Sequence, residues 1–372
     1  MRIGVEASSY YKNIAGTGVY IRSIVEILLR KKENKEIILF SNGRQSGLDL
    51  AKKRNMFKRL FNALKDIIWV QIGLPYNLIK NNIDILFCPA YIAPVLSPRP
   101  TVVTIHDASF LRYPNTCDKL FRLYLKILLP FIKRRADVIL TDSFFSKNEI
   151  VELLKISPEK VQVVYCGCNK NFRIIDDIIE IDRMRLKYDL PKNFILHVGT
   201  LEPRKNITTL VLAFNLLKKK ELIEHKLIIC GNRGWYYDDI YNKVRELKLE
   251  KEVVFTGYIP NEDLPFLYNM ADVFVLPSLY EGFGLPVLEA MACGCPVVSS
   301  NTSSIPEVVG DAGILVDPYN IDEIANGILK IIKDEELRND LIKRGVEQSK
   351  MFSWENTAKQ ILDIFEETLH KH

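Results

Sequence analysis

The stretch that decides the fold is DVFVLPS (272–278), which continues after Leu279 as YEGFGLPVLEAMACGCPVV (280–298). Its first seven residues form a short apolar run that is typical of a buried strand. Pro286 suits the first turn of a helix, because the N–H that proline lacks would find no partner there. A second apolar run, at 296–299, follows this helix closely. Strand, loop, helix and strand in this order predict a βαβ unit with parallel strands.

The same alternation of apolar runs and amphipathic stretches extends over the whole chain. Many of the runs are apolar throughout, as expected of parallel strands that are covered on both faces. We therefore predict an α/β fold with two Rossmann-like, doubly wound parallel sheets facing a cleft. The expected strands are 3–7, 36–40, 83–88, 101–106, 138–142 and 161–165 in the first half, and 194–199, 226–231, 253–256, 273–277, 296–299 and 313–316 in the second.

A charged, Asp-rich segment separates the two series of strands, and there we place a linker at 174–191. The N-terminal domain is then 1–173 and the C-terminal domain 192–351. Residues 352–372 are expected to form a terminal helix. In open α/β sheets ligands bind beyond the C-terminal ends of the strands, so this edge of each sheet is where we look for functional residues.

The composition fits a folded protein of two or three domains, with 372 residues, 48% apolar and 26% charged. No apolar run approaches the roughly 18 uncharged residues that a transmembrane helix needs. The N-terminus, MRIGVEASSY, starts as a strand and lacks the apolar core of a signal peptide. Seven cysteines without a C-x-x-C pair, and five scattered histidines, predict buried reduced thiols and no metal site. We expect a cytoplasmic location.

Charge is divided unevenly along the chain. Residues 1–173 hold 28 Lys and Arg against 14 Asp and Glu, a net +14, whereas residues 174–372 hold 23 against 32, a net −9. The excess gathers at 51–70, where Lys52, Lys53, Arg54, Lys58 and Arg59 alternate with apolar residues, and at 119–138. The first stretch is typical of a helix on the anionic inner face of a membrane, and the second of a core helix with a basic end. The alternative for the first stretch is a core helix whose solvent-facing side is basic. No nucleic-acid-binding module accompanies the charge.

Two glutamates frame the loop and helix after the deciding strand. Gly282 and Gly284 allow a ligand to approach the backbone, and the free N–H groups at the helix start favour an anion. Glu289, on the helix, suits a ribose diol, whereas Glu281, at the loop tip, suits sugar hydroxyls. The alternative is that both are solvated carboxylates on a connecting loop.

A second anion site is predicted in HVGTLEPRKNITTLVLAF (197–214), which reads as strand, loop and helix. Arg204 and Lys205 stand next to the helix start and could hold a diphosphate together with the amides of 282–285. No Asp-x-Asp triplet stands at a strand end, so a Mg²⁺ bridge to phosphate is not expected. A solvated basic loop is the alternative.

Two further segments in the first half point at a ligand. AGTGVYIRSIVEILL (15–29) reads as a glycine-rich loop that enters a helix, with Gly16 and Gly18 close to a phosphate or sugar. The third glycine of a dinucleotide fingerprint is replaced by Ile21, which disfavours a dehydrogenase. TIHD (104–107) ends a strand and places His106 and Asp107 at the ligand edge. A core histidine bonded to backbone is the alternative for His106.

The two-glutamate segment, VGTLEPRKN, the GTG loop and the IHD strand end occur in this order and together resemble glycosyltransferase family 4 over essentially the whole chain. The resemblance implies a retaining enzyme of the GT-B fold that moves a sugar from a nucleotide-sugar to an acceptor, with no cofactor and no obligatory metal. It also implies that the terminal helix returns to the N-terminal domain. The EPRKN motif (202–206) is similar to the corresponding segment of GDP-mannose-dependent mannosyltransferases of surface polysaccharide synthesis.

The resemblance carries roles over by position. Arg204 and Lys205 would grip the diphosphate and Glu289 the ribose. Glu281 would hold the donor sugar, and His106 would contact that sugar near its 6-hydroxyl, with Asp107 on the acceptor side. The remaining donor-binding residues would be Gly16, Gly18, Tyr258, Ile259, Phe283, Gly284 and Leu285.

Several alternatives stay open at this point. The donor could be UDP-glucose, UDP-N-acetylglucosamine or dTDP-rhamnose instead of GDP-mannose, and the acceptor a glycan or a lipid-linked sugar. A nucleotide-sugar epimerase of the same shape would convert the sugar without an acceptor. A nucleotide-sugar sensor would bind without turnover. For transfer we expect front-side attack, in which a donor phosphate oxygen takes the acceptor proton and cations stabilise the leaving diphosphate.

Overall fold

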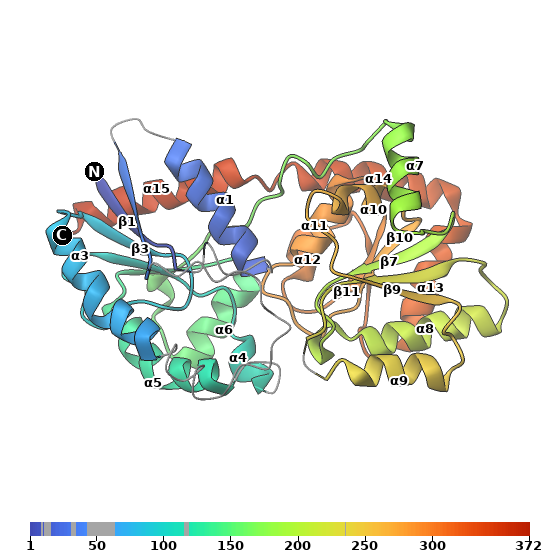
Figure 1. The fold of residues 1–372 in the computed structure, drawn as a ribbon, viewed down its shortest axis with the longest axis horizontal. Coiled ribbons are helices and arrows are strands. Elements are labelled where there is room, and N and C mark those ends of the chain that lie inside the picture. The colour runs from blue at the N-terminus through green and yellow to red at the C-terminus, as the bar shows by residue number, and fades with distance from the viewer. Residues whose placement is uncertain (9, 11–15, 31–34, 43–63, 115–118, 235) are drawn as a thin grey trace. The chain divides into compact units, whose positions relative to one another are not determined.

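The chain divides into two compact units. The computed structural model describes residues 1–8, 10, 16–30, 35–42, 64–114, 119–234 and 236–372 (Figure 1). The first unit comprises Met1–Arg112, Cys117–Gly167 and Trp354–His372, and the second comprises Tyr113–Thr116 and Cys168–Ser353. Apart from the short segment Tyr113–Thr116, the chain passes between units at 167/168 and 353/354, whereas the sequence suggests 173 and 351.

Residues 174–191, which the sequence assigns to a linker, lie in the second unit instead. Ten of them form helix α7, Ile178–Lys187. The helix begins here because the Asp177 side chain accepts a hydrogen bond from the Glu180 N–H at 3.1 Å, which caps its first turn. Aspartates that look like linker residues in the sequence therefore start a helix.

The first unit is built on a sheet of six parallel strands in the order β2-β1-β3-β4-β5-β6. Strands β3, β4 and β5 are buried along their whole length, so helices cover both faces. The strands are β1 Arg2–Glu6, β2 Glu36–Phe40, β3 Ile85–Cys88, β4 Thr101–Thr104, β5 Val138–Thr141 and β6 Val161–Val163.

The helices of the first unit pack on this sheet around a core that includes Leu78, Phe110, Leu129 and Ile150. Residues 64–68 are helical and lead through a π-helical turn, Trp69–Gly73, into α3. The other elements are α1 Gly16–Arg30, α3 Leu74–Lys80, α4 Ser109–Arg112, α5 Lys119–Arg135, α6 Phe144–Leu154, the 3-10 turn Pro158–Lys160 and α15 Trp354–His370.

The glycines of α1 and the two basic stretches of the first unit differ in how far the structure supports the predictions made for them. Gly16 and Gly18 lie in the first turn of α1 and not in a loop before it, because a first turn tolerates residues of low helix propensity whose N–H groups lack partners anyway. The basic residues between 51 and 59 lie outside the described part of the chain. Helix α5 buries Leu125 and Leu129 as a core helix should, and three basic residues, Lys133, Arg134 and Arg135, lie in its last turn.

The second unit repeats the plan with the strand order β12-β11-β10-β7-β8-β9, all parallel. The chain winds outward from β7 to β9, then crosses to the other side of β7 and continues through β10 to β12. The strand order therefore reverses between β7 and β10, the point at which open α/β sheets bind ligands. The strands are β7 Phe194–Val198, β8 Lys226–Cys230, β9 Val253–Gly257, β10 Val273–Leu276, β11 Val297–Ser300 and β12 Ile314–Val316.

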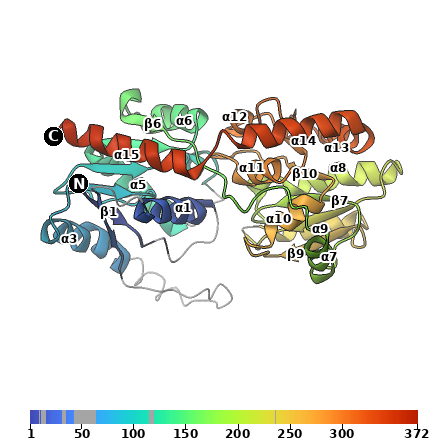
Figure 2. The same ribbon diagram turned by 90° about the horizontal axis from the view of Figure 1, so that it is seen from above.

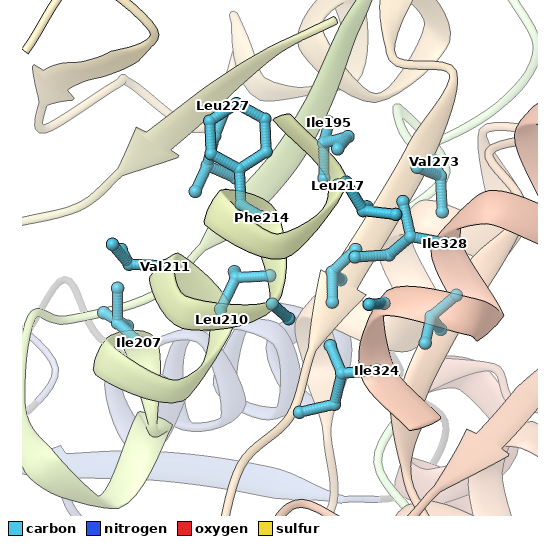
Figure 3. Close-up of a cluster of buried hydrophobic side chains, with 14 of the residues drawn as sticks. Ile195, Ile207, Leu210, Val211, Phe214, Leu217, Leu227, Val273, Ile324 and Ile328 are labelled. Carbon is cyan, nitrogen blue, oxygen red and sulfur yellow. The ribbon is translucent and has the colours of Figure 1, made fainter. Parts of the chain in front are cut away.

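In the core of the second unit, helices α8 and α13 pack against the sheet. Figure 3 shows Leu210, Phe214 and Leu217 of α8 in one cluster with Ile195 and Leu227 of the sheet and with Ile324 and Ile328 of α13. Full burial of one such side chain contributes about 1.5–3 kcal/mol. The helices are α7, the 3-10 turn Pro203–Lys205, α8 Ile207–Lys219, α9 Asp238–Glu246, α10 Leu264–Met270, α11 Leu285–Ala292, α12 Ile305–Val309, α13 Ile321–Lys333 and α14 Glu335–Ser349.

The terminal helix α15 belongs to the first unit, which confirms the predicted return. It lies beside α1 (Figures 1 and 2). Trp354 packs edge-on against Tyr20 of α1, with 5.8 Å between ring centroids, and Phe365 meets Phe87 of β3 at 5.3 Å. The Thr357 hydroxyl donates to the Tyr165 carbonyl at 2.7 Å. These contacts make the last helix part of the first hydrophobic core.

Every predicted strand is present, with ends that move by one or two residues. Six described cysteines are free, and five of them are buried. Among the described residues, no helix combines the length and the apolar composition that a membrane crossing requires.

Gly231 offers a test of close backbone packing at the ligand edge of the second sheet. It has φ +152°, and a Cβ there would lie 1.9 Å from the Gly199 carbonyl oxygen. We expect Gly231→Ala to destabilise the protein by about 3 kcal/mol, because the backbone has to move apart. Gly257→Ala is the matched control: φ is +73° but a Cβ would meet nothing within 4 Å, so the cost is about 1 kcal/mol of strain. Equal losses in urea unfolding would contradict the packing argument.

Candidate active site

Two loops meet at the point where the strand order of the second sheet reverses. One follows β7 and contains the 3-10 turn Pro203–Lys205 before α8, and the other follows β10 and leads to α11. The Leu279 N–H donates to the Arg204 carbonyl at 2.9 Å, which ties the loops together. Since β7 and β10 are parallel neighbours, residues more than 70 positions apart in the chain face one another here.

The side chains at this point form a buried ion-pair network. Lys205 Nζ lies 2.6 Å from Glu281 Oε1, and Arg204 Nη1 lies 3.1 Å from Glu281 Oε2. Arg204 also donates to Glu202 Oε1 at 2.8 Å from Nη2 and to the Tyr280 carbonyl at 2.6 Å from Nη1. The Ser278 hydroxyl donates to Glu281 Oε1 at 2.6 Å. Two cations and two carboxylates therefore balance one another.

The network fixes the charge of its members. Burial raises the pKa of Glu281, but Lys205 and Arg204 overcome this and lower it to about 2. Glu281 is thus an anion at neutral pH and a very weak base. His197 of β7 donates from Nδ1 to the Val275 carbonyl at 2.9 Å, and burial lowers its pKa to about 4. A neutral imidazole therefore lies near Lys205.

The loop that carries Glu281 is held by hydroxyls from the loop after β11. The Glu281 N–H donates to Ser303 Oγ at 3.1 Å, and Ser304 Oγ donates to the carbonyls of Glu281 and Phe283 at 2.9 Å each. Gly284 then turns the chain into α11 with φ +114°, a conformation that favours glycine. The predicted donor-binding residues 283–285 therefore stand on a rigid turn at a helix start.

Glu289 lies on α11, as the sequence predicts, and is half-buried. It accepts a hydrogen bond from the Tyr268 hydroxyl at 3.1 Å. Burial raises the pKa of Glu289 to about 8. The carboxyl is therefore mainly protonated at neutral pH, and can both donate and accept hydrogen bonds, as binding a diol requires.

The loops after β8 and β9 extend the same edge. The Gly231 N–H donates to the Gly257 carbonyl at 2.9 Å, and the Leu201 N–H donates to the Asn232 carbonyl at 2.9 Å. Tyr258, which follows Gly257, is exposed, whereas the side chain of Ile259 is buried. The segment predicted to contact the base is therefore joined through the β8 loop to the loop that carries Arg204.

The remaining predicted residues lie in the first unit. His106 and Asp107 follow β4, at the C-terminal edge of that sheet. Asp107 is half-buried, with Oδ1 bonded to the Ser109 hydroxyl at 2.7 Å and the Tyr91 hydroxyl at 3.2 Å. Gly18 is buried and Gly16 is exposed in α1. His106 is buried and bonded to the Asp142 side chain.

Sequence reasoning missed four side chains in these clusters: Glu202, Ser278, Tyr268 and Asp142. Glu202 lies in the motif 197–214 and Ser278 in the stretch 272–278. Both follow a strand end within four residues, and this position was the signal that could have identified them. Asp142 also directly follows its strand, β5. Tyr268, on α10, gave no signal, since only the fold brings it to Glu289.

Within the described residues, no group of three or more His, Cys, Asp or Glu side chains is arranged to hold a metal ion. What the network offers is an anion site. Lys205 Nζ directs one of its three N–H donors at Glu281, and this is the one hydrogen bond of the side chain in the described part of the chain. Two cations at the start of α8 face a loop of backbone amides, which suits a phosphate or diphosphate.

Two family models match the chain, one over each half. The model described as Glycosyltransferase Family 4 matches residues 14–172, and Glycosyl transferases group 1 matches residues 179–348. O-antigen chain mannosyltransferase B of Escherichia coli is 40% identical over 265 residues, which cover 71% of this chain and 69% of the relative. The serotype-specific mannosyltransferase WbdA of the same species is 34% identical over 276 residues, 72% of this chain but 33% of WbdA. The chain thus spans about a third of that longer relative.

Solved structures share the fold over the full chain. Sucrose-phosphate synthase from Thermosynechococcus elongatus has a TM-score of 0.78 at 23% identity and covers 100% of both chains. HepE of Anabaena in complex with UDP-glucose has a TM-score of 0.75 at 20% identity and covers 99% of this chain and 100% of HepE. At these identities the likeness concerns the fold, and it confirms the predicted pair of doubly wound sheets.

The buried pair Lys205–Glu281 can be tested by unfolding. We expect Glu281→Gln to destabilise the protein by about 3 kcal/mol at pH 7, because it leaves a buried ammonium without its counter-charge. Since the pKa of Glu281 is lowered, this stabilisation is complete above its ordinary pKa and is lost as the pH falls toward about 2. The difference between variant and wild type should therefore shrink from pH 7 to pH 3.

The matched control is Glu246→Gln, which breaks the exposed pair with Lys243 at 2.7 Å. We expect a cost under about 1 kcal/mol, since water screens this pair. Urea unfolding at both pH values measures the difference. A Glu281→Gln cost as small as the control would show that the network contributes nothing to folding.

Proposed function

This chain belongs to glycosyltransferase family 4 and has the GT-B fold, and from this premise we propose that it transfers a hexose from a nucleotide-sugar to a glycan or lipid-linked acceptor with retained anomeric configuration. The observation that carries the proposal is the cation pair Arg204 and Lys205, held against the Glu281 loop where the second sheet reverses its strand order. This is the place where a nucleotide diphosphate fits an open α/β sheet.

We propose mannose as the sugar and GDP as its carrier. Two relatives that are 40% and 34% identical are called mannosyltransferases, and one of them acts on an O-antigen chain by its name. The EPRKN motif (202–206) supports GDP as the nucleotide of the donor. HepE is seen with UDP-glucose, which keeps a UDP-sugar as the alternative donor. A role in surface polysaccharide synthesis follows from the O-antigen relative.

In the proposed reaction, the bond between the anomeric carbon and the diphosphate oxygen breaks, and the acceptor hydroxyl oxygen bonds to that carbon on the same face. The acceptor proton passes to a phosphate oxygen of the leaving nucleoside diphosphate. Lys205 and Arg204 stabilise the charge that develops on the diphosphate, which is the largest contribution that preorganised groups can make. Glu281 is unsuited to act as a nucleophile, because Lys205, Arg204 and Ser278 already bind its oxygens.

In the proposed reaction no metal ion is needed, because Lys205 and Arg204 bind the diphosphate directly. The protonated Glu289 on α11 would bind the ribose diol. The amides of Phe283, Gly284 and Leu285 would meet the phosphate, and the backbone at Tyr258 and Ile259 the base. Gly16, Gly18, His106 and Asp107 are proposed to serve the sugar and the acceptor from the first unit.

A panel of donors tests this proposal. With GDP-mannose, UDP-glucose, UDP-N-acetylglucosamine and dTDP-rhamnose, we expect the fastest donor hydrolysis or transfer with GDP-mannose.

Lys205→Ala and Arg204→Ala should each lower kcat by on the order of 10²-fold or more, because each removes charge at the leaving diphosphate. Arg245→Ala, at an exposed arginine of α9 bonded to Asn242 at 3.2 Å, is the control. Excess chelator should leave the rate unchanged.

Four outcomes would contradict the proposal. Near-normal turnover in both cation variants would remove the role of the pair. Loss of turnover with chelator would show that a metal supplies the charge. An isomerised nucleotide-sugar formed without any acceptor would favour the epimerase, and donor binding without any reaction would favour a sensor.

We further propose that the first unit rests on an anionic membrane surface. Leu64, Ile68, Ile72, Tyr76 and Ile79 are all exposed and recur every three or four residues along the helical segment 64–80. We call this row the apolar stripe. Helix α5 exposes a similar row, Leu123, Ile127 and Phe131.

Charge supports a lipid surface as the partner. Lys65 and Lys80 are exposed at the two ends of the apolar stripe, and Lys126 and Arg134 are exposed on α5. Apolar residues beside lysine and arginine match a surface of acyl chains and anionic headgroups. The net +14 of residues 1–173 adds attraction at longer range.

Vesicle binding tests the apolar stripe. We expect Ile72→Asp with Ile79→Asp to weaken binding to phosphatidylglycerol vesicles by about 10-fold or more, because burying one large apolar side chain contributes over 1.4 kcal/mol. Tyr319→Asp, at an exposed tyrosine of the second unit, is the control and should not change binding. Co-sedimentation measures the affinity. A wild-type protein without affinity for these vesicles, at low salt, would refute the membrane proposal.

A further inference from the structure

A buried histidine–aspartate pair lies at the C-terminal edge of the first sheet. His106 follows β4 and Asp142 follows β5, the neighbouring parallel strand. His106 Nδ1 lies 2.8 Å from Asp142 Oδ2, and each residue is 6% exposed. An ionisable pair this deep costs desolvation energy, so its retention at a sheet edge calls for an explanation.

Aromatic rings hold the imidazole in place. Tyr20 of α1 packs edge-on against His106 with 4.8 Å between ring centroids, and Tyr91 packs against it at 5.7 Å. Tyr20 is itself fixed by its hydroxyl, 3.3 Å from Thr104 Oγ1, and by Trp354. The ring of His106 is therefore clamped between two aromatic side chains as well as bonded to Asp142.

One ring nitrogen of His106 is left without a hydrogen-bond partner in the part of the chain that the structure describes. His106 Nε2 is buried and has no partner of normal hydrogen-bond geometry among the described residues, and the same holds for Asp142 Oδ1. The Pro89 carbonyl lies near His106 and the Cys166 thiol near Asp142, but neither forms a hydrogen bond of normal geometry with these two atoms. A core histidine that served only packing would satisfy both nitrogens. Here one nitrogen is committed to a carboxylate and the other is left over, which is the arrangement of a histidine whose second nitrogen acts on a ligand.

We propose that Asp142 is a positioning residue, which accepts the Nδ1 proton of His106, fixes the ring and presents Nε2 as the atom that accepts a hydrogen bond from a substrate hydroxyl. The identity of that hydroxyl as a sugar or acceptor group rests on the proposed function. Asp142 itself touches no substrate in this arrangement.

The charges around His106 agree with this geometry. Burial lowers the pKa of His106, but the charge and hydrogen bond of Asp142 outweigh burial, and Asp107 and the Pro89 carbonyl add to them, so the pKa is raised overall. The Cys166 thiol lies next to Asp142, and its pKa is raised by burial, so it stays neutral. Tyr20 is also buried, with a raised pKa. Asp142 is thus the main group that holds the imidazole proton.

Asp142→Asn tests the pair in the unliganded protein. Selective ¹⁵N-histidine labelling, with His106→Gln to assign the signal, reports the tautomer and the pKa. We expect the wild type to carry its proton on Nδ1. In Asp142→Asn the pKa should fall by about one unit or more, because burial remains while the counter-charge is gone. The acidic limb of the kcat/KM profile should move to lower pH, and kcat/KM should fall by about 10-fold or more.

Asp137→Asn is the matched control, because Asp137 lies just before β5 and pairs with the exposed His372 at 2.9 Å. Its other oxygen accepts a hydrogen bond from the Thr101 N–H at 2.7 Å, which the asparagine oxygen can also accept. It should leave the His106 signal and the pH profile unchanged. If Nε2 carries the proton in the wild type, or if kcat/KM falls in Asp142→Asn with no change in tautomer or pKa, the positioning role is overturned. Failure of the proposed function is seen separately, as a wild type that transfers sugar from no donor, since the tautomer is read without substrate.

Discussion

The structure of the candidate site depends on the Glu281 carboxylate, which forms ion pairs with both Lys205 and Arg204. A lysine with 8% exposure can stay charged only if a carboxylate stands beside it. This requirement joins the loop after β7 to the loop after β10, and Ser278, Ser303 and Ser304 then hold the second loop in place. The cations are therefore oriented before any ligand arrives, which is the condition for electrostatic catalysis.

The two sheets use the same plan. In each, a buried pair of ionisable side chains follows neighbouring parallel strands: His106 and Asp142 after β4 and β5, Lys205 and Glu281 after β7 and β10. Parallel strands bring their C-terminal ends to one edge, so a charged residue placed after one strand meets its partner after the next. Each pair joins a carboxylate to a nitrogen base or cation, and burial makes both members depend on the contact.

The two pairs differ in what they leave available. Glu281 has both oxygens bound and a pKa of about 2, so it acts as a fixed anion while Lys205 keeps donors for a ligand. In the first unit the carboxylate of Asp142 holds one nitrogen of His106 and leaves the other without a partner. Fixed charge at one sheet edge and an oriented imidazole at the other suit a leaving diphosphate and a sugar hydroxyl, respectively.

The sequence by itself determined the strands, their parallel arrangement, the terminal helix and the motifs around Arg204 and Glu281, because apolar periodicity and turn residues are local properties. The sequence predicted a linker at 174–191, and there the structure has helix α7 instead, because the Asp177 side chain caps its first turn. Only the tertiary structure decided that Lys205 pairs with Glu281, that Tyr268 bonds to Glu289 and that Asp142 holds His106. Strands β7 and β10 are neighbours although two strands separate them in the chain, and such pairings depend on how the whole sheet winds.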